Sequence, residues 1–222
     1  MAHHHASSPD DRRPTTDDGP HRPSVVGRRS SVVAGGAGRA VDKRRRKGLV
    51  MIWTGKGKGK TTAALGLALR AAGHKMPVLF LQFIKGQWKT GERQALPHLA
   101  PYVEHVVMGR GFTIERLRNK NVPMEAHHDA ARAALAFARE AVQSGKYQMV
   151  VLDEIMASIH AGLIDLADVV ALVRDKPPAL HLVLTGRNTP PELVEVADLV
   201  SEVHPIKHPF AAGIPAQRGV EF

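Results

Sequence analysis

The 222-residue sequence has no cysteine, only 5% aromatic residues and no long run of uncharged apolar residues. The absence of cysteine excludes disulfides, thiolate metal sites, iron–sulfur clusters and cysteine nucleophiles. No stretch approaches the roughly 18 apolar residues of a membrane-spanning helix, and the polar residues that follow Ala6 lack the apolar core of a secretory signal. We therefore expect a soluble, cytoplasmic protein with no membrane partner.

The net charge of +10 is concentrated near the N-terminus. Residues 1–50 hold 11 of the 31 Lys and Arg but only 5 of the 21 acids, a balance of +6 that leaves +4 for the other 172 residues. This region is rich in Ser, Pro, Gly, Asp and Arg, so it cannot bury enough apolar surface to offset its ordering entropy. We predict a disordered basic tail over residues 1–47 and one folded domain over residues 48–222. Because no aromatic residues are interleaved with the basic run at residues 42–47, nucleic-acid binding is disfavoured.

From residue 48 onward, short apolar or β-branched runs alternate with helical patterns. This alternation is typical of an α/β domain with a mostly parallel central sheet flanked by helices. The runs are apolar along almost their whole length, which predicts strands buried on both faces. The expected strands are residues 49–54, 78–84, 103–109, 149–155, 181–186 and 199–205. The expected helices are residues 60–72, 124–144, 166–174 and 191–197.

The sequence TGKGKGKTT, residues 54–62, lies between the first expected strand and the first expected helix. Glycines permit left-handed backbone angles, so successive N–H groups can converge on an anion at the N-terminus of a helix. A flexible turn would explain the glycines but not the alternating lysines, which repel one another unless an anion lies between them. We predict a phosphate-binding loop in which Lys60 neutralises phosphate and the Thr61 hydroxyl binds Mg²⁺.

The loop departs from the standard spacing G-x-x-x-x-G-K-[ST]. That spacing requires glycine at position 54, where this chain has Thr54, and the nearest glycine is Gly55. The loop is therefore one residue short and presents a different number and direction of amides. A triphosphate bound to it need not lie as it does in an NTPase built for chemistry at the γ-phosphate.

The stretch MVVLDEI has two carboxylates, Asp153 and Glu154, after four apolar residues. Carboxylate oxygens are hard ligands that suit Mg²⁺, and the other half of a nucleotide site is expected at the end of a neighbouring strand. The alternative is that the pair caps the next helix. The nearby phosphate loop favours the metal site.

Two adjacent histidines, His127 and His128, lie in the predicted helix 124–144. Adjacent positions point to different faces of a helix, which disfavours a shared metal ion. We expect both side chains to be exposed to solvent.

Seven stretches together resemble the ATP:corrinoid adenosyltransferases of the P-loop type. They run in the expected order from Thr54 to Phe222. They are TGKGKGKTTAALGLALRAAGH, QFIKGQWKTGE, GFTIE, VVLDE, LTGR, ADLVSEV and KHPFAAGIPAQRGVEF. The resemblance implies a RecA-like P-loop NTPase fold and an enzyme of cobalamin biosynthesis or salvage. Such an enzyme transfers the 5′-deoxyadenosyl group of ATP to the Co(I) centre of a reduced corrinoid and releases triphosphate.

The resemblance also implies residue roles. Lys60, Thr61 and Glu154 would be catalytic, and Mg²⁺ would be held by Thr61, Asp153 and Glu154. The implied ATP-binding residues are Gly55, Lys56, Gly57, Lys58, Gly59, Lys60, Thr61, Thr62 and Arg187. The implied corrinoid-binding residues are Trp88, Phe112 and Ile114. Phe112 matches an aromatic residue that crowds the lower face of the corrin, whereas Ile114 stands where many relatives carry a second aromatic residue, for which Trp88 could compensate.

Partners follow from the same resemblance. With no cysteine and no G-x-G-x-x-G after a strand, the chain has no evident means of reducing cobalt. A separate reductase of the flavoprotein type is therefore implied as electron donor, and the family suggests a homodimer.

Two alternatives remain. The first is a P-loop NTPase or kinase that acts on the γ-phosphate and is coupled to nucleic acid through the basic tail, and it predicts phosphate as a product. The second is a carrier of corrinoid or nucleotide that binds its ligand without turnover.

Overall fold

The computed structural model describes residues 47–84, 90–111 and 121–221. The tail predicted over residues 1–47 lies outside this part of the chain, apart from Lys47. The strands are β1 (Val50–Thr54), β2 (Val78–Gln82), β3 (Val103–Val107), β4 (Met149–Asp153), β5 (His181–Thr185) and β6 (Leu199–Glu202). The helices are α1 (Lys60–Gly73), α2 (Gly91–Ala95), η1 (Leu96–Leu99), α3 (Met124–Gln143), α4 (Ile155–His160), α5 (Leu166–Arg174), α6 (Pro191–Glu195) and η2 (Pro209–Ala212). None of the helices in the described ranges is both long and apolar enough to cross a membrane.

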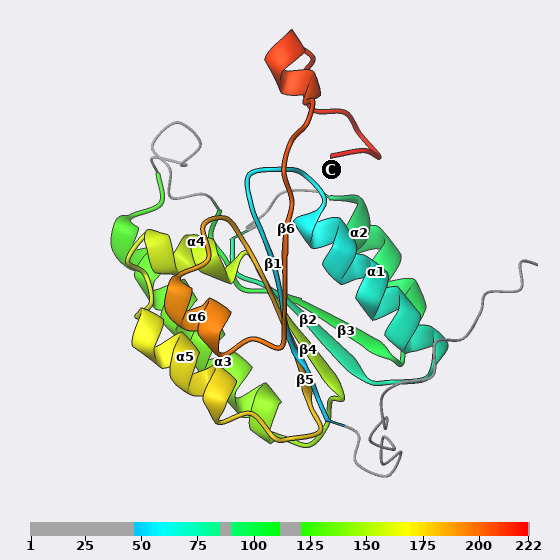
Figure 1. The fold of residues 1–222 in the computed structure, drawn as a ribbon, viewed down its shortest axis with the longest axis vertical. Helices are drawn as coiled ribbons and strands as arrows, with labels where there is room; N and C mark the ends of the chain where they lie inside the picture. The colour runs from blue at the N-terminus through cyan, green and yellow to red at the C-terminus, as the bar shows by residue number, and fades with distance from the viewer. Residues whose placement is uncertain (1–46, 85–89, 112–120, 222) are drawn as a thin grey trace, which may run out of the picture. The chain divides into compact units, whose positions relative to one another are not determined.

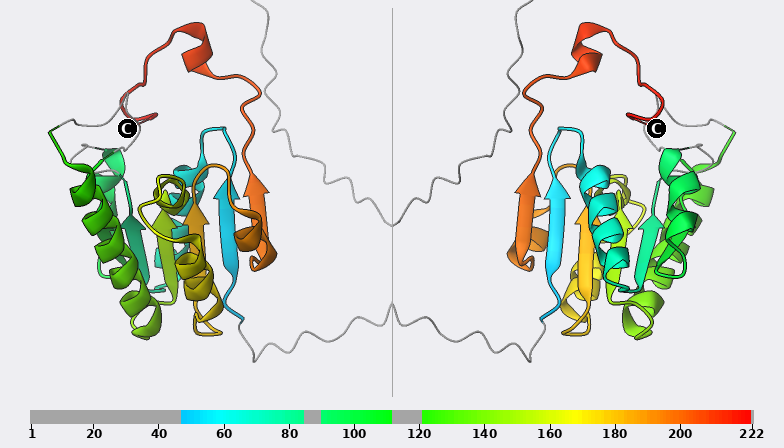
Figure 2. Two further views of the ribbon diagram at one scale, coloured as in Figure 1. Left: turned by 90° about the vertical axis from the view of Figure 1, so that its left-hand side faces the viewer. Right: turned by 90° about the vertical axis from the view of Figure 1, so that its right-hand side faces the viewer.

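The six strands form one parallel sheet in the order β3-β2-β4-β5-β1-β6. Helices α1 and α2 cover one face, and α3 to α6 cover the other (Figure 1). The arrows in Figure 2 all point the same way, so the carboxyl ends of the strands share one edge of the sheet. β5 separates β1, which leads into the phosphate loop, from β4, which ends at Asp153. The predicted α/β class, with a parallel central sheet flanked by helices, is confirmed.

The sheet carries one apolar layer on each face. On the α1 side, Ala64 and Ala68 pack with Phe80 and Val151, and these small helix residues let α1 lie close to the sheet. On the other side, side chains that alternate with them along the strands, such as Leu81, pack with α3, α4 and α5. The central strands are therefore buried on both faces, as their continuous apolar sequence predicts.

The prediction that every strand is buried on both faces is wrong for β6. Leu199 and Val200 are 40% and 39% exposed, and the other half of this strand, Ser201 and Glu202, is polar. β6 pairs with β1 and lies at the end of the sheet order, so it has a strand on one side only. An apolar run marks a strand but does not say whether that strand lies inside the sheet or at its edge.

The predicted strand 149–155 is also too long at its end. Glu154 has φ 62°, in the left-handed region that ends a strand, and α4 begins at the next residue. The Glu154 N–H donates to Thr185 Oγ1 at 2.9 Å, which holds the main chain in this turn. The acidic pair therefore lies at a sharp junction between a strand and a helix.

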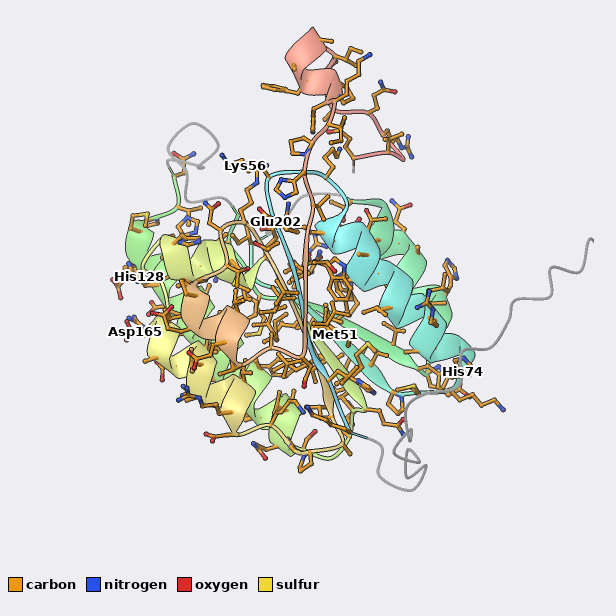
Figure 3. The ribbon with its side chains drawn as sticks, in the orientation of Figure 1. Met51, Lys56, His74, His128, Asp165 and Glu202 are labelled. Atoms are coloured by element: carbon orange, nitrogen blue, oxygen red, sulfur yellow. The ribbon has the colours of Figure 1, made fainter. Side chains whose placement is uncertain are left out.

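His127 contradicts the expectation that both adjacent histidines are exposed. It is 3% exposed, and it lies on the inner stripe of α3 with Ala131 and Ala134. His128 is partly exposed at the side of the molecule (Figure 3). The two rings do point to different faces, but one of those faces is the core.

Candidate active site

The phosphate loop connects β1 to α1 at the carboxyl edge of the sheet. Gly55 and Gly59 have φ values of 96° and 114°, which side chains rarely adopt, so glycine is required at both ends of the loop. Figure 3 labels Lys56 on this loop and Glu202 at the same edge, with His74 at the far end of α1. These two glycines therefore fix the path of the main chain between β1 and α1.

The segment that follows β6 packs directly against this loop. The Gly57 N–H donates to the Val203 carbonyl at 2.7 Å. A Cβ atom on Gly55 or Gly57 would lie 2.5 or 2.8 Å from the same carbonyl oxygen, so neither position accepts a side chain without a shift of the main chain. One amide of the shortened loop, that of Gly57, is thus already used within the protein.

Lys60 bridges the loop from inside. Its Nζ donates to the carbonyls of Gly55 and Gly57 at 2.8 and 2.7 Å, and the residue is only 6% exposed. Burial lowers the pKa of the amine; Glu154 opposes this effect by raising the pKa, Arg187 lowers it and Asp153 raises it. The Lys60 amine therefore lies within electrostatic reach of three charged side chains at the ends of β4 and β5.

Asp153 is the centre of a buried hydrogen-bond cluster. Its Oδ1 accepts from the hydroxyls of Thr61 at 2.9 Å and Thr185 at 2.7 Å, and its Oδ2 accepts from Gln82 Nε2 at 3.0 Å. Asp153 itself is fully buried. A buried carboxylate is costly unless it is hydrogen-bonded, and these three donors compensate for its burial.

The donor set suits a hard divalent cation. The Thr61 hydroxyl gives its single hydrogen to Asp153, so the lone pairs of its oxygen are left to accept or to coordinate. Carboxylate oxygens of Asp153 and of the next residue, Glu154, complete a set of oxygen ligands that fits Mg²⁺. The alternative capping role is not supported, because Glu154 occupies the N-cap position of α4 without a capping hydrogen bond from its side chain.

The remaining predicted ATP ligands lie around the loop. Lys56 and Arg187 are exposed, and Lys58 forms an ion pair with Glu221 at 2.8 Å. Thr62 is exposed and, with Thr61, lines a cavity of about 590 Å³. The other walls of this cavity come from α1, from α2 with η1, and from residues 219–221.

The three predicted corrinoid-binding residues, Trp88, Phe112 and Ile114, lie outside the described residues. The predicted site residues do not include Gln82, Thr185 or Glu221, although each of them lies in a stretch that carries the family resemblance. Gln82 and Thr185 are polar residues at the ends of apolar strands, the same pattern as Asp153. Glu221 has no such signal, because only the fold brings it to the phosphate loop.

Comparisons with known proteins identify the family of this chain. The profile of the family described as ATP:corrinoid adenosyltransferase BtuR/CobO/CobP matches residues 46–222. A corrinoid adenosyltransferase from Sinorhizobium sp is 45% identical over 179 residues, which cover 79% of this chain and 81% of that protein. A corrinoid adenosyltransferase from Escherichia coli (strain K12) is 39% identical over 177 residues, which cover 79% and 86% of the two chains.

Among solved structures, the flagellar accessory protein FlaH from Methanocaldococcus jannaschii is similar at a TM-score of 0.48 and 12% identity, over 71% of each chain. The family assignment comes from the sequence matches, and the profile match spans the phosphate loop, the acidic pair and the C-terminal segment. The resemblance seen in the sequence is thus confirmed, and the chain belongs to the ATP:corrinoid adenosyltransferase family.

Proposed function

We propose that this protein transfers the 5′-deoxyadenosyl group of ATP to the Co(I) centre of a corrinoid, in cobalamin biosynthesis or salvage. One observation carries the proposal. In a chain of this family, the phosphate-loop residues Lys60 and Thr61 converge with the carboxylate of Asp153 at one buried site. That site is suited to hold a polyphosphate and its metal ion.

In the proposed reaction the lone pair of Co(I) attacks C5′ of the ribose. A Co–C bond forms, the C5′–O bond breaks, and its electrons leave with the bridging oxygen on the triphosphate. The corrinoid and the nucleotide supply both reacting atoms, so the protein has little covalent chemistry to perform. Its tasks are to position the two substrates and to stabilise charge on the departing triphosphate.

The site residues support that division of work. The Lys60 amine can exchange its two carbonyl acceptors for phosphate oxygens, a contact that becomes stronger as negative charge gathers on the leaving group. Thr61, Asp153 and Glu154 would hold Mg²⁺, which neutralises polyphosphate charge when it is bound. Lys56, Lys58, Thr62 and Arg187, with the loop glycines, would bind the rest of the nucleotide.

The corrinoid side of the site is proposed from the resemblance alone. Trp88, Phe112 and Ile114 would contact the corrin, with Phe112 crowding its lower face. A separate flavoprotein reductase would supply the electron that converts Co(II) to Co(I), because the sequence contains no cysteine or dinucleotide fingerprint. A homodimer is proposed on the same ground.

The test is anaerobic incubation with ATP, Mg²⁺ and chemically reduced Co(I) cobalamin. We expect a light-sensitive Co–C product that mass spectrometry identifies as the adenosylated corrinoid, formed only when both substrates are present. Release of orthophosphate without alkylation of cobalt would overturn the proposal in favour of a γ-phosphate enzyme. Tight binding of both ligands without turnover would overturn it in favour of a carrier.

A further inference from the structure

A chain of hydrogen bonds runs from the candidate metal site to the edge of the sheet across three neighbouring strands. Asp153 of β4 accepts from Gln82 Nε2 of β2 at 3.0 Å, and Gln82 Oε1 lies 3.0 Å from His105 Nε2 of β3. Strand order places β2 between β3 and β4. Gln82 is in register with Asp153, whereas His105 is in register with Phe80, two residues before Gln82 on β2. We propose that Gln82 and His105 are positioning residues, which hold the Asp153 carboxylate in the orientation that Mg²⁺ and ATP require.

The direction of each bond follows from the chemistry of the groups. An ionised carboxylate only accepts hydrogen bonds, so the Gln82 amide must turn its NH₂ end toward Asp153. Its carbonyl oxygen then faces His105, and that contact is a hydrogen bond only when His105 Nε2 carries a hydrogen. His105 therefore locks the amide in one of its two orientations. The flipped amide would place its oxygen against a buried negative charge.

The surroundings leave Gln82 little freedom to find other partners. Gln82 is fully buried, and its main-chain carbonyl accepts from the Met108 N–H at 3.1 Å. The His105 ring is held in turn by an edge-to-face contact with Phe80, with ring centroids 6.1 Å apart. Phe80 thus orients the His105 ring, His105 orients the Gln82 amide, and Gln82 orients the Asp153 carboxylate.

The orientation of the Asp153 carboxylate also determines how the Thr61 hydroxyl is directed. Gln82 holds one carboxylate oxygen of Asp153, so the other oxygen faces the hydroxyls of Thr61 and Thr185. While Thr61 donates its hydrogen to Asp153, its lone pairs are directed elsewhere and can meet a cation. Without the Gln82 donor, the carboxylate could rotate and Thr61 would lose this constraint. Partners of this kind behind a ligand commonly change metal affinity or activity by about 10- to 100-fold when they are removed.

This inference rests on the proposed function, because it assumes that Mg²⁺ binds with ATP at Thr61 and Asp153. The test compares Gln82→Leu, His105→Phe and His105→Gln with the wild-type full-length chain. Phenylalanine keeps a ring against Phe80 but has no donor, whereas glutamine restores an N–H. Calorimetry without corrinoid measures ATP affinity with and without Mg²⁺, and the thermal midpoint without ligand reports stability.

We expect Gln82→Leu to weaken Mg²⁺-dependent ATP binding about 10-fold and to affect metal-free binding much less. His105→Phe should also weaken Mg²⁺-dependent ATP binding, and His105→Gln should recover most of the lost affinity. If either loss variant lowers metal-free and metal-dependent binding equally, or changes only the thermal midpoint, the positioning role is wrong. His105 is half-buried on an edge strand, so its variants are expected to fold. They can therefore be tested even if Gln82→Leu does not fold.

The two proposals fail in different ways. A wild-type protein that binds ATP with Mg²⁺ but never alkylates cobalt contradicts the proposed function and leaves the positioning role standing. A wild-type protein that alkylates cobalt, together with a His105→Phe variant whose Mg²⁺ dependence is unchanged, contradicts the positioning role alone.

Discussion

Lys60 is a buried lysine inside the loop between β1 and α1. Its amine is held within the loop by two carbonyl acceptors, and it is buried enough for its pKa to be lowered. Both carbonyl contacts are made with neutral groups, so a polyphosphate that replaces them gains a charged partner in a weakly solvated place. We therefore propose that phosphate replaces the two carbonyl oxygens as the partner of the Lys60 amine.

Replacing Lys60 with alanine should reduce adenosyl transfer at least about 100-fold, because one positioned donor to developing charge commonly contributes that much. The measurement is kcat/KM for formation of the Co–C bond. Lys75→Ala is the matched control, since Lys75 is an exposed lysine beyond the far end of α1. Transfer by Lys60→Ala at the rate of the control variant would contradict the phosphate-loop role.

At the residue scale, the sequence predicts the site only where the chemistry is local. The loop glycines, Lys60 and Thr61 follow from one short segment, and two of those glycines do take left-handed angles. The donors to Asp153 come instead from β2, β5 and α1, which are distant in sequence. Their meeting depends on the strand order, which hydrophobic patterns do not encode, so Gln82 and Thr185 were missed.

At the element scale, the segment after β6 contacts the phosphate loop at both of its ends. Val203 accepts from the Gly57 N–H, and Glu221 pairs with the neighbouring lysine, Lys58. Almost all of the residues between them are exposed. The Glu221 carboxylate therefore pairs with a lysine that we propose as a triphosphate ligand, so we expect the two anions to compete for Lys58.

We expect Glu221→Gln to tighten binding of inorganic triphosphate by up to about five-fold, because a partly exposed ion pair contributes about 1 kcal/mol or less. The gain should shrink as salt is added, since screening weakens both attractions. Calorimetric titration at low and at high ionic strength measures the effect, with Glu195→Gln on α6 as a control for the loss of one exposed charge. Weaker binding by Glu221→Gln would mean that this carboxylate supports the ligand rather than competing with it.

The start of β1 is joined to β5 by His181. Its Nδ1 accepts from the Leu49 N–H at 3.1 Å, and burial, with a smaller effect of Lys176, lowers the pKa of the imidazole. A lowered pKa in the folded state means that the unfolded chain binds the proton more tightly. The contribution of His181 to stability is thus fully present above its ordinary pKa of about 6.5 and is lost as the pH falls through its folded pKa.

His181→Asn should keep an acceptor for the Leu49 N–H but remove the titration. We expect the thermal midpoint of the wild-type protein to fall more than that of the variant between about pH 7 and about pH 5. Thermal unfolding across this range measures both profiles. Parallel profiles would show that other groups control the acid sensitivity.

The elements themselves were predicted unevenly. All six strands and the helices α1, α3, α5 and α6 lie where the apolar patterns place them, because those patterns reflect burial on a sheet or a helix face. The short helices α2 and α4 were missed. α4 begins directly after Glu154, which has left-handed backbone angles and follows the last residue of β4. Because apolar residues lie on both sides of the acidic pair, the pattern predicted one longer strand instead of a strand followed by a helix.

At the scale of the whole molecule, the site is built where the strands end. Lys60 follows β1, Gln82 ends β2, Asp153 ends β4 and Arg187 follows β5, so four chain segments meet at one edge of a parallel sheet. Ligands of open α/β sheets bind at this edge. The α/β class and this location were predictable from alternation alone, whereas the exposure of β6 required the strand order.

We expect removal of residues 1–39 to leave the rate of cobalt alkylation unchanged, because the phosphate loop and the acidic pair belong to the segment from residue 48 onward. Steady-state rates of the full chain and the shortened chain, compared at saturating ATP and corrinoid, measure the effect. A large loss of kcat would show that the basic tail takes part in the reaction.

The central claim is that the C5′–O bond of ATP breaks and the triphosphate leaves whole. The most direct measurement uses ATP with a heavy-oxygen label at the 5′ bridging position, together with Mg²⁺ and Co(I) cobalamin. Mass spectrometry and phosphorus NMR should find the label in inorganic triphosphate and an unlabelled 5′-deoxyadenosyl group on cobalt. Label retained in ADP, with orthophosphate as the other product, would contradict the account.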